Sequence, residues 1–264
     1  MLRNVFTKTL WDARRSLPTW VAAIAAIGAM YGAFWPTMDT PSMQQAMRGY
    51  PKAVLEAMNY NDVASPAGYL GSSVYGLLIP LLVTVFAIAN GTRAVAGDEE
   101  AGTLDLLLSY PVGRTRLAVQ RFTAMIAALV LIGLVLWLAM LAISGPAKLT
   151  GISAASFGAT TLQLELFGLW FGGLAFAIGA ATGKRVLALG ASSAIAVLTY
   201  LANGVFPQLA GLKWTRSVSP WHWYLGGEPL RNGLQVGDSL LMLCTALVMV
   251  AAGTMLFNRR DLAV

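Results

Sequence analysis

The stretch FTAMIAALVLIGLVLWLAMLAIS, residues 122–144, contains no charged side chain and decides the fold class. A helix needs roughly 20 apolar residues to cross the hydrocarbon core of a bilayer. Lipid offers no water to backbone N–H and C=O groups, so a spanning segment must satisfy them internally, as a helix does. The sequence therefore predicts a membrane-spanning helix over this stretch.

Five similar stretches lie on either side of it. They run near Leu17–Trp35, Leu70–Thr92, Phe157–Thr182, Val186–Phe206 and Ser239–Asn258, and only Glu165 places a formal charge inside one of them. The 264-residue chain is 57% hydrophobic and 11% charged, whereas soluble domains carry about 25% charged residues. We predict an all-α membrane protein, a single domain over residues 1–264 that forms a six-transmembrane-helix bundle.

Lysine and arginine indicate the orientation of this bundle. If the N-terminus is cytoplasmic, 12 of the 18 basic residues fall on the cytoplasmic side and 6 on the other. Cytoplasmic loops carry such an excess, and anionic lipid attracts it. We predict a multi-pass protein of the cell (inner or plasma) membrane with both termini cytoplasmic. The net charge of +6 then indicates contact with membrane lipid, and nucleic acid is not expected as a partner.

Residues 1–16 predict an amphipathic helix before the first span. Phe6, Leu10, Ala13 and Leu17 are spaced four, three and four residues apart, so they share one helical face. The charged Lys8, Asp12 and Arg15 lie opposite. Such a helix lies flat on the inner leaflet. The pattern fits a plain membrane anchor and an elbow helix that supports a docking surface equally well.

The segment between the second and third spans is the most informative cytoplasmic one. It reads RAVAGDEEAGTLDLLLSYPVGRTR over residues 93–116. Its three consecutive acids suit a helix N-terminus, and Leu104, Leu107 and Leu108 share one face of the following turn or two. Pro111 disfavours helix at the residue before it and ends the element. The leucine face suits a groove of a partner protein or the membrane surface.

Residues 97–114, GDEEAGTLDLLLSYPVGR, resemble the signature of type-2 ABC transporter permeases. That signature has an acid, then Gly-Thr-Leu-Glu-Leu-Leu-Leu-Ser, one residue, Pro-Val and a basic residue; Asp105 stands where Glu is common. The amphipathic start, the six spans and the stretches Ser219-Pro220 and 229–233 agree with the same family. The resemblance thus spans essentially the whole chain.

The resemblance implies a function that composition alone does not indicate. It implies a permease subunit of an ATP-driven exporter that works by alternating access. A second permease, identical or homologous, and ABC ATPase subunits would be its partners, with ATP and Mg bound to the ATPases and no cofactor bound by this chain. Residues 98–111 would be the coupling helix in a groove of the ATPase. The coupling residues it implies are Asp98, Glu99, Glu100, Thr103, Leu104, Leu107, Leu108, Pro111 and Arg114.

The chain offers little material for catalysis of its own. It has one cysteine, Cys244, and one histidine, His222, so metal and nucleophile–base sites are not expected. Residues 179–185, GAATGKR, are the nearest match to a phosphate-binding loop. They have three residues between the glycines where the motif needs four, and Arg185 stands where it has Ser or Thr. We therefore predict that the subunit is not an enzyme.

Three polar residues within spans are candidates for a transport path: Glu165, Tyr200 and Asn203. Intramembrane charges mark functional sites by default, but we expect Glu165 only a turn or two from the outer surface, where it could simply reach water. Two alternative functions stay open. One is a secondary carrier, which usually places ionisable groups at the bilayer midplane, and the other is a non-transporting membrane scaffold.

Overall fold

The computed structural model describes residues 4–42, 45, 49, 65–104 and 113–260. Its described part is helical, contains no strand, and includes six helices long and apolar enough to cross a membrane. These six are built on α2 (Ser16–Ala33), α7 (Ile79–Thr92), α10 (Arg114–Ser144), α11 (Ala154–Thr182), α12 (Arg185–Gly204) and α15 (Val236–Arg259). The predicted six-helix membrane bundle is confirmed.

The second span is a composite of five short segments. It consists of α6 (Pro66–Ser73), the π-helix η1 (Val74–Leu78), α7, the π-helix η2 (Arg93–Gly97) and α8 (Asp98–Glu100). Pro80 explains the position of η1, because proline lacks an N–H and its ring crowds the carbonyl four residues earlier. A π-helical turn just before the proline absorbs this break, and such turns are frequent at functional sites.

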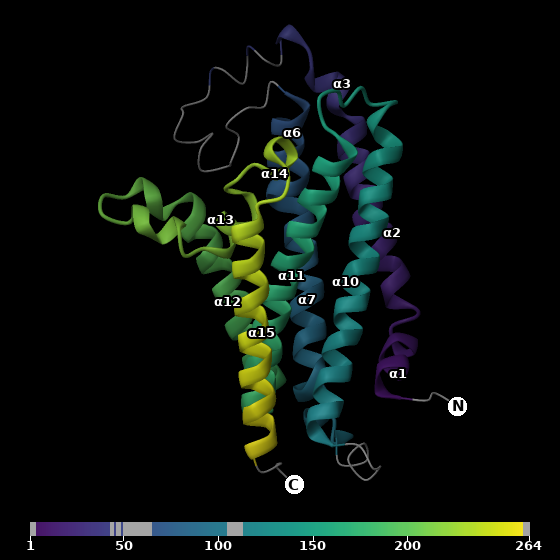
Figure 1. The fold of residues 1–264 in the computed structure, drawn as a ribbon, viewed down its shortest axis with the longest axis vertical. Helices are drawn as coiled ribbons and strands as arrows, with labels where there is room; N and C mark the ends of the chain where they lie inside the picture. Colours follow the sequence, from purple (N-terminus) through teal and green to yellow (C-terminus); the bar gives the residue numbers. More distant parts are fainter. Residues whose placement is uncertain (1–3, 43–44, 46–48, 50–64, 105–112, 261–264) are drawn as a thin grey trace.

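α11 is the central helix of the bundle. In its most apolar window 67% of the residues are buried, against 11% in the corresponding window of α12. α7 and α15 pack most closely against α11, while α2 packs on α10 at the edge (Figure 1). Four fully buried phenylalanines of α11 fill the core: Phe157, Phe167, Phe171 and Phe176. Gly91 of α7 lies against the backbone of Gly172, where a Cβ would collide with the Gly172 carbonyl.

α11 and α12 form a tight helical hairpin. α11 ends at Thr182, and the Gly183 that follows takes the left-handed conformation, with a φ of 69°, that glycine adopts without strain. The next helix begins at Arg185. The link between the two spans is therefore only Gly183 and Lys184.

The amphipathic helix α1 (Val5–Asp12) precedes α2. The Asn4 side chain accepts a hydrogen bond from the Thr7 backbone N–H and caps it. The Val5 backbone N–H donates to Gln120 Oε1 at 3.1 Å, which fixes α1 to α10. Of the predicted apolar face, Leu17 is buried, whereas Phe6, Leu10 and Ala13 are half-buried.

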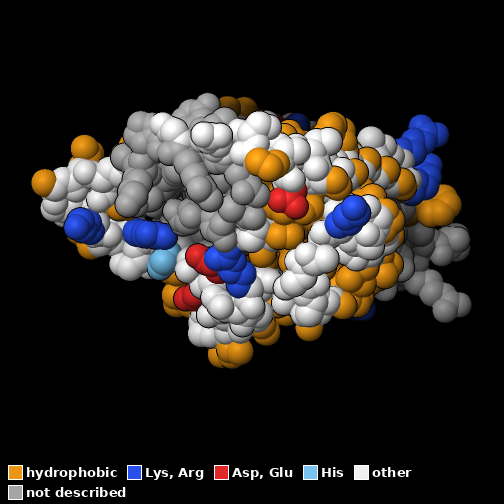
Figure 2. Space-filling model, turned by 90° about the horizontal axis from the view of Figure 1, so that it is seen from above, with side chains coloured by type: hydrophobic (Ala, Val, Ile, Leu, Met, Phe, Trp, Pro, Cys, Tyr) orange, Lys and Arg blue, Asp and Glu red, His pale blue; other side chains and the backbone are white. Residues whose placement is uncertain are grey.

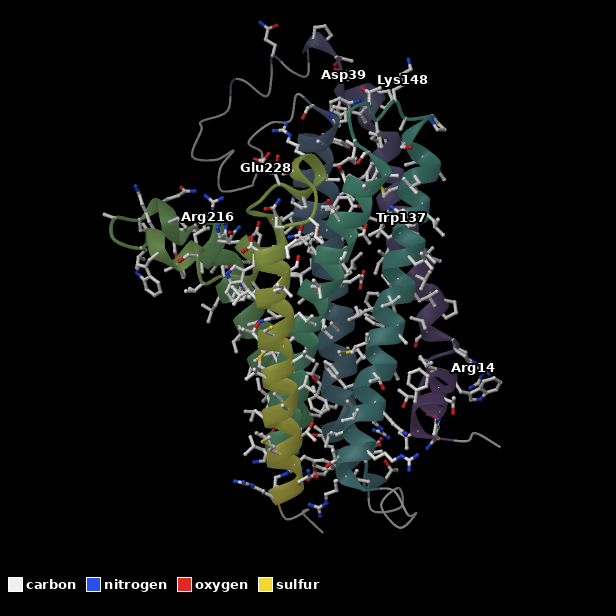
Figure 3. All side chains as sticks on the ribbon, in the orientation of Figure 1. Arg14, Asp39, Trp137, Lys148, Arg216 and Glu228 are labelled. Atoms are coloured by element: carbon white, nitrogen blue, oxygen red, sulfur yellow. The ribbon has the colours of Figure 1, made fainter. Side chains whose placement is uncertain are left out.

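Both termini lie at the same end of the bundle, which we call the terminal end (Figure 1). Arg14 lies toward this end, and Asp39, Lys148 and Glu228 lie at the opposite, distal end (Figure 3). Seen from the distal end, acidic and basic side chains are interspersed among polar and hydrophobic ones (Figure 2). The short elements of the distal half are α3 (Trp35–Met38), η3 (Phe206–Gln208), η4 (Lys213–Arg216), α13 (Pro220–Leu225) and α14 (Pro229–Asn232). Which face of the membrane the terminal end occupies stays a prediction.

Candidate functional site

The end of the second span is tied to the third by a half-buried ion pair. Asp98, the first residue of α8, pairs with Arg121 of α10. The same guanidinium donates to the Ala94 carbonyl at 3.1 Å, and that carbonyl belongs to the π-helix η2. A charge-assisted contact of this kind is stronger than a neutral one. Arg121 therefore holds both η2 and α8 against α10.

A second ion pair ties the same segment to the last span. Glu99 pairs with Arg260, the residue that follows α15. The side chains are 9% and 21% exposed, respectively, so water screens this pair only weakly. A Cβ at Gly183 would collide with both partners, which places the α11–α12 turn directly against the pair. We call Asp98, Glu99, Arg121 and Arg260 the terminal ion-pair cluster.

Arg114 reinforces the contact between α10 and α15. Its guanidinium donates to the Arg260 carbonyl at 2.7 Å and lies 5.8 Å from the centre of the Phe257 ring. Beside it, Asn258 Nδ2 donates to Thr115 Oγ1 at 2.8 Å. The start of α10 and the end of α15 are thus joined by hydrogen bonds and by a cation–π contact.

Residues 101–103 interrupt the helix that was expected over 98–111. α8 ends at Glu100, and Gly102 then takes a φ of 67°, which breaks the helix. The Thr103 backbone N–H donates back to the Asp98 carbonyl at 2.9 Å and closes this turn. Leu104 is only 2% exposed, so it packs inside this subunit and not on a face open to a partner. Leu107, Leu108 and Pro111 lie outside the described residues.

The acids of this segment have different surroundings. Asp98 and Glu99 are held within the subunit, whereas Glu100 is exposed. A cleft of about 230 Å³ adjoins them between α1 and the helices α7 and α10, lined by Asp12, Asn90 and Arg93 among others. The terminal end therefore presents one free acid of the three, beside a cleft of mixed charge.

Glu165 lies well inside its span. It is about three helical turns from the first residue of α11, and its distance from the outer membrane surface stays a prediction. The side chain is 9% exposed, and within the described part of the chain neither carboxylate oxygen has a hydrogen-bond partner. Gly133 of α10 makes room for it, since a Cβ there would lie 2.9 Å from Oε1.

Tyr200 and Glu165 lie on opposite sides of α11, and a transport path that includes Glu165, Tyr200 and Asn203 stays a prediction. The Tyr200 ring packs edge-on against Trp221 at 5.0 Å, and Trp221 packs against Phe167 of α11 at 4.7 Å. Phe167 follows Glu165 by two positions, which places the two side chains on opposite sides of the helix. Glu165 therefore faces α10, and Tyr200 lies on the α12 side.

Sequence reasoning missed the partners of the acids. Arg121 and Arg260 entered the sequence interpretation only as basic residues that mark orientation. The one indication for Arg121 was that it directly precedes the third span, at the same end of the bundle as the three acids. Gly133 gave no signal, because its role depends on which residue of α11 lies opposite. In the described ranges no group of three or more His, Cys, Asp or Glu residues could hold a metal ion.

Six spans, an amphipathic start and a charged terminal segment define a multi-pass membrane protein, and comparison with known proteins identifies its family. The profile described as ABC-2 family transporter protein matches residues 3–262. The chain belongs to this family.

A related protein agrees with the family assignment. The probable ABC transporter permease protein NosY of Pseudomonas aeruginosa is 29% identical, across 72% of this chain and 79% of the relative. The resemblance seen at residues 97–114 is therefore confirmed, and the chain is a membrane subunit of an ABC transporter.

Proposed function

We propose that this subunit couples ATP hydrolysis on separate cytoplasmic ATPase subunits to the export of a substrate by alternating access. In this proposal the terminal end is cytoplasmic. A second permease subunit, identical or homologous, completes the membrane part, and ATP and Mg bind only to the ATPases. Family membership and the sequence of residues 97–114 support the proposal.

The structural observation that best supports this proposal is the terminal ion-pair cluster. A coupling element must be attached firmly to the spans that it moves. Asp98 and Glu99 attach α8 to α10 and to the end of α15. Glu100 is exposed and is free to contact a partner, with the segment that continues to Pro111 beyond it. In this arrangement Asp98 and Glu99 transmit motion from α8 to the spans, and Glu100 fixes the position of the coupling segment on the ATPase.

Two substitutions in the coupling segment test the proposal. Leu107→Asp would force a charge into an apolar groove of the ATPase, and Glu100→Lys would reverse the exposed charge. Lys213→Glu, an equally large charge reversal at an exposed residue far from the terminal end, is the matched control. Leu104→Asp is unsuitable because Leu104 is buried within the subunit.

The readout is the amount of ATPase that co-purifies with the permease and its rate of ATP hydrolysis. Leu107→Asp should lower both by about tenfold or more, since a buried uncompensated charge costs several kcal/mol. The Lys213→Glu control should retain both. Undiminished complex formation and hydrolysis in Leu107→Asp would refute the coupling role. Export predicts that ATP drives accumulation of a transported compound inside inverted vesicles.

The alternatives from the sequence predict different results. An ion-driven carrier would use Glu165 as its ionisable group, and its transport would persist without any ATPase. A non-transporting scaffold would bind an ATPase that hydrolyses ATP while no compound crosses the membrane. Family membership favours the ATP-driven transporter over both.

A further inference from the structure

A groove on the lateral surface of α10 and α11 has Glu165 among its lining residues. The cavity measures about 290 Å³, near the lower end of the range of small-molecule sites. Its rim is formed by Val130, Leu134 and Leu162, which are 57%, 48% and 48% exposed. Apolar side chains exposed along spanning helices face lipid, so this groove opens sideways into the membrane.

The walls of the groove are aromatic and aliphatic. Trp137, in the distal half of α10 (Figure 3), lines it, and its Nε1 donates to the Ala154 carbonyl at 3.1 Å. Gly158 lies close to the same indole, with its Cβ position 3.5 Å from Nε1. Because its only donor is already used, the indole offers the groove an apolar π surface, which attracts cations.

The polar groups of the groove are one carboxyl group and one hydroxyl group. Glu165 contributes two carboxylate oxygens, both without a hydrogen-bond partner among the described residues, and Thr161 contributes a hydroxyl that lies 3.5 Å from the Tyr75 hydroxyl. The lining contains no lysine, arginine or histidine. An anionic headgroup would find no positive charge here, and a plain alkyl chain would leave the buried carboxyl without a partner, which is costly.

We propose that this groove binds a hydrophobic primary amine in its ammonium form, with the head against Glu165 and the alkyl tail along Val130, Leu134 and Leu162. A carboxylate, an aromatic wall and an apolar rim together match such a ligand. Both carboxylate oxygens are buried in this structure, so the Glu165 side chain must rotate toward the groove to meet a small ammonium head. The ligand would enter from the bilayer. This binding is independent of ATP coupling and is measured without an ATPase.

The test uses the full chain in lipid nanodiscs with a matched pair of photo-crosslinking probes. One probe is dodecylammonium and the other is neutral dodecanol, each with a diazirine near the head. The amine should label peptides that contain residues 130–137 and 158–165 more strongly than the alcohol does. Glu165→Gln should lower amine labelling about tenfold, because a charge–charge contact at low dielectric is lost, and should leave alcohol labelling unchanged.

Two further variants keep the test decisive if Glu165→Gln fails to fold. Leu134→Trp fills the groove from its exposed rim without altering Glu165 and should lower labelling by both probes. Glu228→Gln, at an exposed acid of the distal end, is the control and should change neither.

Three results would overturn the proposal. One is equal labelling of these peptides by amine and alcohol, and another is amine labelling that survives both Glu165→Gln and Leu134→Trp. The third is a disulfide between two copies of Leu134→Cys in a Cys244→Ser background, which would mean that a second copy covers the groove.

Discussion

Separating Glu99 from Arg260 should destabilise the whole bundle and not only its terminal end. The pair joins residues 161 positions apart and closes α8 onto the end of α15 against the α11–α12 turn. Replacing Glu99 by Gln keeps the shape of the side chain and removes its charge. Arg260 then stays largely buried without a counter-charge, and its Nε has no hydrogen-bond partner in the described part of the chain.

The expected size of the effect follows from the exposure of the two side chains. Ion pairs on the surface contribute about 0–1 kcal/mol, while breaking a fully buried pair costs about 3–5 kcal/mol. Glu99 is 9% exposed and Arg260 is 21% exposed, which places this pair between the two cases. We expect Glu99→Gln to lower the free energy of unfolding by about 2 kcal/mol. A coupling energy of about 1.5–3 kcal/mol is expected in the double-mutant cycle with Arg260→Gln.

The assay is equilibrium unfolding of the full chain by SDS in mixed micelles. The control cycle uses Glu228 and Arg231, a pair 3.3 Å apart whose side chains are 51% and 37% exposed. Its coupling energy should stay within about 0–1 kcal/mol. If Glu99→Gln and Arg260→Gln act additively, or if the control pair couples as strongly, the pair does not hold the bundle together.

Two further predictions concern other parts of the bundle. Gly91→Ala should lower the free energy of unfolding by about 1–3 kcal/mol, because the methyl group would collide with the Gly172 carbonyl. The control, Gly190→Ala, has no neighbouring atom within 4 Å of the new Cβ and should not destabilise the protein. An equal loss in both variants would contradict the reasoning. Burial, assisted by the charge of Arg216, lowers the pKa of His222 in the folded protein. The neutral His222 side chain therefore contributes stability above its unfolded-state pKa of about 6.5. This contribution is lost as the pH falls through the lower pKa of the folded state. Between pH 7 and pH 5 the free energy of unfolding should fall more for the wild type than for His222→Gln. Equal losses in the two proteins would refute this prediction.

The spans could be found from the sequence because an uncharged apolar stretch of roughly 20 residues seldom occurs outside membrane-spanning helices. Their ends could not be found in the same way. α10 begins at Arg114 and not near Phe122, since basic turns can continue a helix beyond the hydrocarbon. The π-helices η1 and η2 were not predicted either. Pro80 alone indicates only that the regular helical pattern is broken nearby, not that the break takes the form of a π-helix.

The candidate sites were predictable in composition but not in geometry. The three acids at residues 98–100 were recognised as a functional element, yet the sequence offers no means of pairing Glu99 with an arginine at the other end of the chain. Leu104 was expected on a face that meets a partner groove or the membrane surface, and it is buried in the structure. Periodicity shows which residues share a face but not what covers it. The start of α11 at Ala154 was expected three residues later, so the sequence did not fix how far Glu165 lies from the end of its helix.

Under the proposed coupling role, the terminal ion-pair cluster would let one short element act on most of the bundle. A displacement of α8 would be carried to α10 by Asp98 and to α15 by Glu99, and the α11–α12 turn lies against the second pair. The same element continues into α7, whose backbone meets α11 where Gly91 lies against Gly172. Packed interiors are close to incompressible, so α7, α10, α11 and α15 should move together. α2 makes its main contact with α10, and α12 is the least buried span. The other four helices can therefore shift past α2 and α12 at the smallest cost in free energy.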